Sequence, residues 1–402
     1  MTRMTLESAA VAVHACLAQL RVEELLAHMR RTRGVSRPLV AVHEDTPLDE
    51  VLATMRDEGI HALPVFRTLA GRPDDRLFRG IVSVFDILSA TICQRMFDGM
   101  ADADHVLSMS KQEFARHLKT LEAERAFFAT KIGSLIGTTR ESAEAKILHS
   151  TSPLTTLLRL FTSTRCHRTL VLDDDEVIAT ACSSDEAFRA APVAAGSALR
   201  IVSQTDVVEF LLNPSVWASI RLAAQSPAEF DAALEHILAL PVSAAEELAV
   251  GRLPARDADA NQPLDAKTGK PRRHVVSVHS GVSALAALRC MFVHRVQSVA
   301  VTDDSGRLAA SISAADLRGI TADNLETLVS PVFDFLEAER RTPAQLKPDQ
   351  LRTALPDTHV GVAAGRMLES RVHRLWIVNS HDKLVGVVSM TDVLALLEPA
   401  AA

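Results

Sequence analysis

The hydrophobic and polar positions along the chain repeat one order of elements four times. In each unit, apolar residues at helical spacing are followed by a β-type apolar run, and then by a second run that ends in Ser-x-x-Asp before a further helix. The predicted first helices cover residues 46–59, 152–164, 280–294 and 358–370. The Ser-x-x-Asp runs lie at 80–90, 199–212, 308–320 and within 371–397. Each unit therefore predicts strand, helix, strand, strand, helix, an α/β fold with mostly local sheets.

The repeats and the segments between them predict the domain organisation. It comprises an N-terminal helical segment (1–35), repeat 1 (36–95), a helical linker (96–142), repeat 2 (143–213), a helical and then flexible linker (214–272), repeat 3 (273–322), a connector (323–350) and repeat 4 (351–398). A unit of about 55 residues is small for independent stability, so we expect each repeat to bury its apolar face against another copy.

Some local features of the repeats also follow from the pattern. Each predicted first helix starts near a Ser, Thr or Asp that is suited to N-capping. Repeats 1 and 2 carry insertions before their last strand, at residues 67–78 and 173–198, whose composition predicts exposed, mobile loops.

Taken singly, Ser-x-x-Asp is typical of a helix N-terminus, where the Ser caps the backbone and the Asp favours the helix dipole. Each copy, however, also has a basic residue at the head of the neighbouring strand. An Asp in a first helical turn can accept hydrogen bonds from a ribose diol, and basic side chains with helix-end N–H groups suit phosphate. The combination predicts a nucleotide pocket, although solvated strand-end histidines remain the alternative.

Composition narrows the classes of protein. The 402 residues carry a formal net charge of -7, which argues against a general nucleic-acid binder. No apolar run approaches the roughly 20 residues of a membrane span, and the five cysteines are scattered without a C-x-x-C pair, which argues against a zinc site. The chain also lacks a Gly-rich phosphate loop, G-x-S-x-G and H-E-x-x-H. We therefore expect a binding protein without catalytic residues or a metal.

The four units resemble cystathionine-β-synthase (CBS) domains, and residues 36–398 are similar to the AMP-activated protein kinase gamma-subunit family. The segments that carry the resemblance are "RVHRLWIVNSHDKLVGVVSMTDVLALL", "RCHRTLVL" and "RIVSQTDVVEFLL". "SAADLRGI", "FRGIVSVFDIL" and the looped second repeat look more like the plant-type gamma-like members. The resemblance implies that CBS repeats pack as two pairs in a pseudo-symmetric disc, with AMP, ADP or ATP as regulatory ligands. It also implies a kinase partner with α and β subunits.

The resemblance assigns residues one at a time. Ribose binding falls on the four motif aspartates, Asp86, Asp206, Asp316 and Asp392. Phosphate binding falls on the strand heads and on hydroxyls of repeats 2 and 4, namely His61, His167, Arg168, His294, Arg295, His373, Arg374, Ser203, Thr205, Ser389 and Thr391. Ser83 and Ser313 match the same hydroxyl position in repeats 1 and 3. Because Phe85 and Ala315 replace the hydroxyl residue before the Asp, repeats 2 and 4 are expected to hold the working pockets.

The leading hypothesis is a non-catalytic regulatory subunit that senses adenine nucleotides for a serine/threonine kinase, in the cytoplasm or the nucleus. The alternative is an interaction scaffold that kept the CBS disc and binds nucleotide weakly or not at all. A regulatory part of a transporter or of a nucleotide-synthesis enzyme would need a membrane segment or a barrel domain, and neither is found. The preferred nucleotide, S-adenosylmethionine as a ligand, homodimerisation and the role of the repeat 2 loop stay open.

Overall fold

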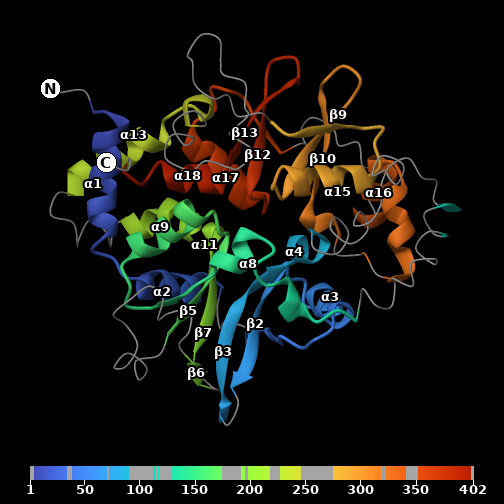
Figure 1. Cartoon of the computed structure of the whole chain (residues 1–402). Helices are drawn as coiled ribbons and strands as arrows, with labels where there is room; N and C mark the ends of the chain where they lie inside the picture. Colours follow the sequence, from blue (N-terminus) through green and yellow to red (C-terminus); the bar gives the residue numbers. More distant parts are fainter. Residues whose placement is uncertain are drawn as a thin grey trace.

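The computed structural model describes residues 4–33, 39–69, 72–89, 112–113, 116, 129–173, 192–194, 198–217, 227–245, 275–317, 320, 322–340 and 352–399. Most of the predicted linker at 96–142, most of the insertion at 173–198 and the flexible segment at 254–273 lie outside these residues. The described chain is a mixed α/β structure (Figure 1).

Four small sheets share one pattern, in which a short first strand runs parallel to a second strand that is antiparallel to a third. In chain order they are β1 (Val42–His43), β2 (Ala62–Leu69) and β3 (Arg72–Ser83); β4 (Ile147–His149), β5 (Arg168–Leu172) and β7 (Leu199–Ser203); β8 (Ser277–His279), β9 (Ser298–Thr302) and β10 (Leu308–Ser313); and β11 (Thr353–Ala354), β12 (Arg374–Val378) and β13 (Leu384–Ser389). The predicted α/β fold of four repeats is confirmed.

Two helical segments accompany each sheet. The first links strands one and two: α3 (Leu48–Asp57), α9 (Leu154–Thr164), α15 (Ala284–Val293) and α17 (Val360–Glu369). The second follows strand three: α4 (Val84–Leu88), α11 (Gln204–Leu212), the 3₁₀ turn η5 (Ala314–Leu317) and α18 (Met390–Ala395). Outside this pattern lie α1 (Leu6–Leu17), α2 (Val22–Arg33), η2 (Ile132–Leu135), α8 (Arg140–Glu144), α13 (Pro227–Leu238), η6 (Ala322–Val329) and α16 (Val332–Arg340).

The first helix of every repeat ends at a left-handed residue: Gly59 (φ 65°), Arg165 (58°), Arg295 (51°) and Arg371 (54°). Glycine adopts this conformation without a steric penalty, whereas each arginine costs about 1 kcal/mol there. In repeats 1, 3 and 4 the next residue donates its N–H to the carbonyl five positions back, the Schellman arrangement that ends a helix. This turn fixes where the second strand of each repeat begins.

The first helices of repeats 1, 2 and 4 begin without a side-chain cap. The N-cap residues of α3, α9 and α17 are Pro47, Pro153 and His359, none of which makes a side-chain cap. Instead, the first helical N–H of each repeat donates to a carbonyl of a connector, as Leu154 does to Leu20 at 2.8 Å. The predicted Ser, Thr or Asp caps are therefore wrong for these three helices, because Thr46, Ser152 and Thr358 each lie one residue before the N-cap position. In α15, Ser283 does act as a cap.

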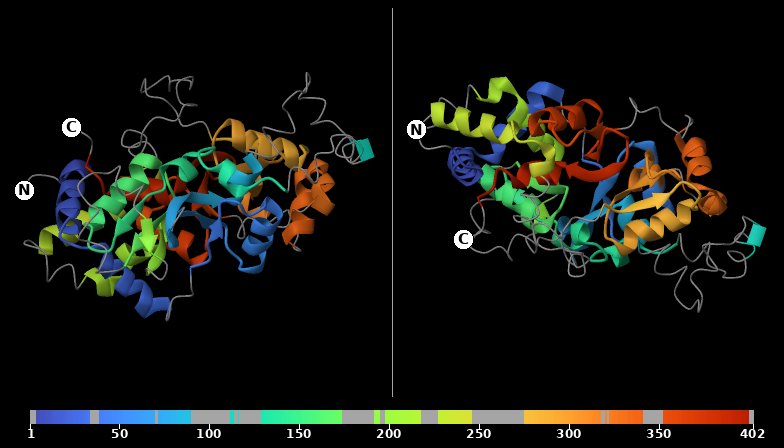
Figure 2. Two further views of the ribbon diagram at one scale, coloured as in Figure 1. Left: turned by 60° about the horizontal axis from the view of Figure 1, so that its bottom comes forward. Right: turned by 90° about the horizontal axis from the view of Figure 1, so that it is seen from above.

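The cores join the repeats in a ring (Figures 1 and 2). Helices of repeats 2 and 4 share one hydrophobic cluster with α1, α2 and α13, and helices of repeats 1 and 3 share another with η6 and α16. The sheets of repeats 1 and 2 pack together around Phe66 and Leu170, and those of repeats 3 and 4 around Ala300 and Trp376. Each repeat thus buries apolar surface against two others, as its small size requires.

The insertion of repeat 1 is not the loop that its composition predicts. Residues 67–69 and 72–78 extend β2 and β3 into a long hairpin, with Phe66 opposite Phe78 and Arg67 opposite Leu77. The guanidinium of Arg76 lies 5.2 Å from the centre of the Phe66 ring. Part of the repeat 2 insertion, β6 (Pro192–Ala194), pairs with the outer edge of this hairpin (Figure 1). Cross-strand pairing outweighs the turn-like composition here.

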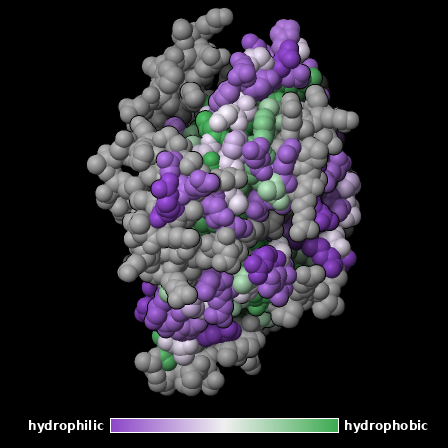
Figure 3. Space-filling view, turned by 90° about the vertical axis from the view of Figure 1, so that its right-hand side faces the viewer, coloured by the Kyte–Doolittle hydropathy of each residue, from purple (hydrophilic) through white to green (hydrophobic). Residues whose placement is uncertain are grey.

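One face of the molecule is mainly hydrophilic among its described residues, with the hydrophobic ones in short bands (Figure 3). Within the described residues, no helix is long and apolar enough to span a membrane.

Candidate functional site

The motif aspartates are built into helix N-termini. In repeats 1, 2 and 4 the Ser hydroxyl accepts the Asp backbone N–H, while Asp Oδ2 accepts the Ser backbone N–H, which makes a capping box. In repeat 3, Asp316 Oδ2 accepts the backbone N–H and hydroxyl of Ser313 at 2.8 and 2.9 Å above a 3₁₀ turn. The capping interpretation of Ser-x-x-Asp is thus correct in repeats 1, 2 and 4, whereas in repeat 3 the Asp accepts from its Ser without an α-helix to cap. A ligand would have to use the second oxygen of each carboxylate.

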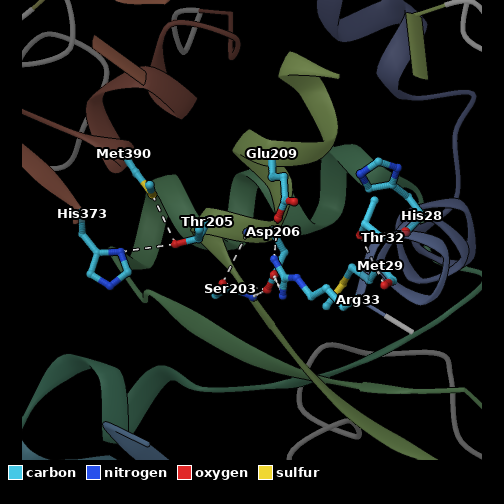
Figure 4. A network of polar contacts seen from close by, with 10 residues as sticks. All are labelled: His28, Met29, Thr32, Arg33, Ser203, Thr205, Asp206, Glu209, His373 and Met390. Atoms are coloured by element: carbon cyan, nitrogen blue, oxygen red, sulfur yellow. Dashed lines mark hydrogen bonds and ion pairs between the residues drawn. The ribbon is translucent and has the colours of Figure 1, made fainter. Parts of the chain in front are cut away.

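The four aspartates differ in exposure and in what else they contact. Asp86, Asp206 and Asp392 are buried, while Asp316 is partly exposed. The hydroxyl of Thr139 donates to Oδ1 of Asp86. Oδ1 of Asp206 lies 2.5 Å from Nη1 of Arg33, at the end of α2 (Figure 4).

Sequence reasoning missed Thr139 and Arg33. Both lie outside the repeats: Thr139 is 53 residues from Asp86 along the chain, and Arg33 is 173 residues from Asp206. The run of basic residues in "HMRRTR" (28–33) is the one local signal, and it does not identify a partner.

The backbone defines which strand-head residues are equivalent. The residue after each motif Ser donates its N–H to the carbonyl of His61, His167, Gln297 or His373. The motif Ser itself pairs with the next residue of the facing strand, which is Ala62, Arg168, Ser298 or Arg374. The His-Arg pair therefore occupies equivalent places in repeats 2 and 4.

The prediction for repeat 3 was out of register. His294 is the C-cap residue of α15, and Arg295 is the left-handed residue after it, so both precede the strand head. The equivalent residues of that repeat are Gln297 and Ser298. The segment "HRVQSVAV" looks like the other strand heads because it begins with His-Arg. The position of the turn after α15, however, decides which residues of this segment face the motif Ser.

Repeats 2 and 4 meet through polar groups at the junction of α11 and α18. The Thr205 hydroxyl lies 3.3 Å from His373 Nδ1, and the buried Thr391 hydroxyl donates to Gln204 Oε1 at 3.0 Å. Gln204 Nε2 in turn donates to the carbonyl of Cys166 at 2.9 Å. The two threonines predicted to contact phosphate thus link the repeats to each other.

The basic strand heads gather at this junction. Burial by the surrounding protein, followed by the charges of Arg168, His167, Arg374 and His61, lowers the pKa of His373 below its ordinary value. The His373 side chain nevertheless remains accessible to solvent. Gln297 of repeat 3 joins the group, with Nε2 lying 3.2 Å from His167 Nδ1. Chemically, the group offers two guanidinium groups and imidazole side chains to an anion.

The junction of repeats 1 and 3 is less polar at the same positions. Here α4 packs against η5, and Phe85 and Ala314 pack against the hydrophobic cluster of the two repeats. Where repeats 2 and 4 have arginine, repeats 1 and 3 have Ala62 and Ser298. Among the described residues, no group of His, Cys, Asp and Glu is arranged to hold a metal ion.

The described chain thus consists of four strand-paired repeats, each with an Asp at the start of its last helical segment. The CBS domain family model matches residues 33–92 and 348–399, so the chain contains CBS domains. Over almost its whole length the chain has a gamma-like homologue: it is 22% identical to the SNF1-related protein kinase regulatory subunit gamma-like PV42b of Arabidopsis thaliana, and the alignment covers 96% of each chain.

Two further comparisons bear on the fold. The chain is 29% identical over 153 residues to protein SDS23 of Kluyveromyces lactis, a match that spans 33% of this chain and 30% of that protein. A protein of Methanocaldococcus jannaschii that has been proposed as an archaeal homologue of g-AMPK superposes with a TM-score of 0.54. That match has 14% identity and covers 93% of this chain and 99% of the other. Identity at this level supports a common fold and nothing further.

Proposed function

We propose that the protein is a non-catalytic regulatory subunit that binds adenine nucleotides at the junction of repeats 2 and 4 and thereby modulates a kinase of the SNF1-related type. The observation that carries the proposal is the meeting of His167, Arg168, His373 and Arg374 between two helices whose N-termini carry Asp206 and Asp392. Guanidinium groups bind phosphate with paired, charge-assisted hydrogen bonds, and the aspartates suit a ribose diol.

Each repeat would contribute part of this site. Arg168 and Arg374 would hold the phosphates, and the N-terminal N–H groups of α11 add a favourable dipole. Burial and the neighbouring arginines lower the pKa of His373 in the ligand-free protein, so a phosphate beside it would favour its protonation. Nucleotide binding would then be accompanied by proton uptake, and affinity would increase as the pH falls toward 6.

Regulation requires that the ligand prefer one arrangement of the repeats. The Thr205–His373 and Gln204–Thr391 hydrogen bonds join the two halves of the proposed site, so a ligand that alters either bond changes how repeats 2 and 4 pack. A fivefold to hundredfold preference, about 1 to 3 kcal/mol, is enough for useful control. The gamma-like homologue supports a kinase as the partner. Co-purification with SNF1-related α and β subunits would test that part of the proposal.

Isothermal titration calorimetry with AMP, ADP, ATP and S-adenosylmethionine tests the ligand. Arg168→Gln and Arg374→Gln should each weaken nucleotide binding at least tenfold. Arg295→Gln, which removes the same charge from the turn of repeat 3, should leave binding within about twofold of the wild type. Equal losses in all three variants would indicate a general effect of charge and contradict a site at this junction.

A docking scaffold that does not bind nucleotide is the second candidate. It is favoured by the partners that the motif aspartates already have, namely the helix caps, Thr139 and Arg33. The absence of heat with every ligand, in a protein shown to be folded by circular dichroism, would support the scaffold over the nucleotide sensor.

A further inference from the structure

Two basic residues of α2 attach this helix to repeat 2. Arg30 Nη1 lies 2.7 Å from Asp173 Oδ2, at the end of β5. One turn later, Arg33 bridges two carboxylates of α11, with Nη1 at 2.5 Å from Asp206 Oδ1 and Nη2 at 2.5 Å from Glu209 Oε2 (Figure 4). The second bridge includes the residue that matches the ribose-binding position of repeat 2.

Both oxygens of Asp206 are engaged in this arrangement. Oδ2 accepts the backbone N–H and the hydroxyl of Ser203 at 2.6 and 2.7 Å, and Oδ1 is held by Arg33. The residue is 5% exposed. A ribose diol would donate its hydroxyl protons to this same carboxylate, so the sugar and the guanidinium compete for one oxygen.

Arg33 can leave without opening the core. Its side chain is 48% exposed, whereas the anchors of α2 lie further back along the helix. Val22, Leu25 and His28 are buried against repeats 2 and 4, and the His28 ring meets Phe210 edge-on at 5.5 Å. Release would therefore be confined to the last turn of α2. Six residues after Arg33, Leu39 of repeat 1 packs between the sheets of repeats 1 and 2.

From this geometry we infer that Arg33 is a latch on the pocket of repeat 2, so that nucleotide binding there displaces Arg33 from Asp206 and frees the end of α2. The inference rests on the proposed function and adds that the two aspartates of the junction are unequal. The pocket at Asp206 is closed by a part of the chain that lies outside the repeats. A nucleotide in that pocket would change the attachment of the segment that leads into repeat 1.

The test is an AMP titration of the full chain by calorimetry, with Arg33→Gln against Arg30→Gln as the matched control. Both variants remove one positive charge of α2. Arg30→Gln removes the ion pair with Asp173, whereas Arg33→Gln removes the pairs with Asp206 and Glu209. Arg33→Gln should tighten binding at repeat 2 by about threefold to fivefold, the upper part of the range for a half-exposed ion pair. The step at repeat 2 is identified as the one that Asp206→Asn removes in the Arg33→Gln background. Arg30→Gln should leave that step within twofold of the wild type.

Hydrogen exchange supplies a second readout. AMP should speed exchange of the amides of residues 29–33 in the wild type and leave them unchanged in Asp206→Asn. Unchanged or weaker binding at repeat 2 in Arg33→Gln, with AMP still binding at Asp392, would overturn the latch alone. If no variant bound AMP, the proposed function would fail and the latch with it.

Discussion

The junction of repeats 2 and 4 and the junction of repeats 1 and 3 share one strand arrangement but differ in chemistry. At equivalent positions, the first has Thr205, Thr391 and two His-Arg pairs, and the second has Phe85, Ala315, His61, Ala62, Gln297 and Ser298. Every motif Asp accepts hydrogen bonds from its Ser, above a 3₁₀ turn in repeat 3 and at an α-helix start in the other repeats. The aspartates therefore serve the fold in all four repeats, and the charged strand heads distinguish the junction that can hold a polyanion.

Apolar packing should be the feature that the two junctions share. Phe161 of α9 and Phe335 of α16 are fully buried in the clusters of repeats 2 and 4 and of repeats 1 and 3. Replacing either by Ala should cost about 3 to 5 kcal/mol, from lost burial and the remaining cavity. Urea unfolding measures this loss. A loss below 1 kcal/mol at one junction alone would show that the two are not packed alike.

The two junctions should differ in whether a buried amide stabilises them. Gln204→Leu leaves the Thr391 hydroxyl and the Cys166 carbonyl without their amide partner, at an expected cost of about 1 to 3 kcal/mol. The equivalent residue of repeat 1 is the buried Val84, and Val84→Gln should cost a similar amount because the apolar junction would have to bury an amide. If Gln204→Leu were neutral in urea unfolding, the polar link would contribute nothing to the junction.

The helix caps offer a smaller contrast. Ser389 both donates to and accepts from Asp392, so Ser389→Ala should cost about 1 kcal/mol, within the usual range for a lost N-cap. Ser313 donates to Asp316 above a 3₁₀ turn, and Ser313→Ala should cost about half as much. Thermal unfolding of the two variants compares them directly. Equal losses would contradict a weaker helix start in repeat 3.

The smallest expected effect is on acid stability. Because the pKa of His373 is lowered in the folded protein, the unfolded chain binds a proton first as the pH falls through 6.5. Stability should therefore decrease from pH 7 to pH 5, by less than about 1 kcal/mol since solvent screens this exposed side chain. His373→Gln should reduce that decrease, as measured by thermal unfolding at both pH values. An identical pH dependence in the variant would show that His373 does not contribute to the loss of stability at low pH.

Local signals in the sequence predicted the local structure. The Ser-x-x-Asp caps and the four-repeat fold follow from spacing and hydrophobic periodicity, which depend on neighbouring residues. The N-cap predictions for α3, α9 and α17 failed because Thr46, Ser152 and Thr358 each lie one residue before the N-cap position. The register of repeat 3 failed because His294 and Arg295 look like a His-Arg strand head, whereas Arg295 is equivalent to the left-handed Arg165 and Arg371.

In the candidate site, too, local features could be predicted and contacts between distant segments could not. The sequence selected the His-Arg pairs and favoured repeats 2 and 4, and the structure brings these pairs together at one junction. No pattern in the sequence indicated that Arg33 contacts Asp206 or that Gln204 and Thr391 bond across the junction. Such contacts depend on how the repeats pack and not on the motif itself.

The most direct measurement is a calorimetric titration with AMP of the wild type, Asp392→Asn and Asp86→Asn. Asparagine keeps an oxygen for the helix cap, so both variants should fold, which circular dichroism can verify. The account predicts that Asp392→Asn weakens or removes AMP binding, while Asp86→Asn leaves the affinity and stoichiometry unchanged. Loss of binding in Asp86→Asn with full binding in Asp392→Asn would place the nucleotide at the apolar junction and contradict the account.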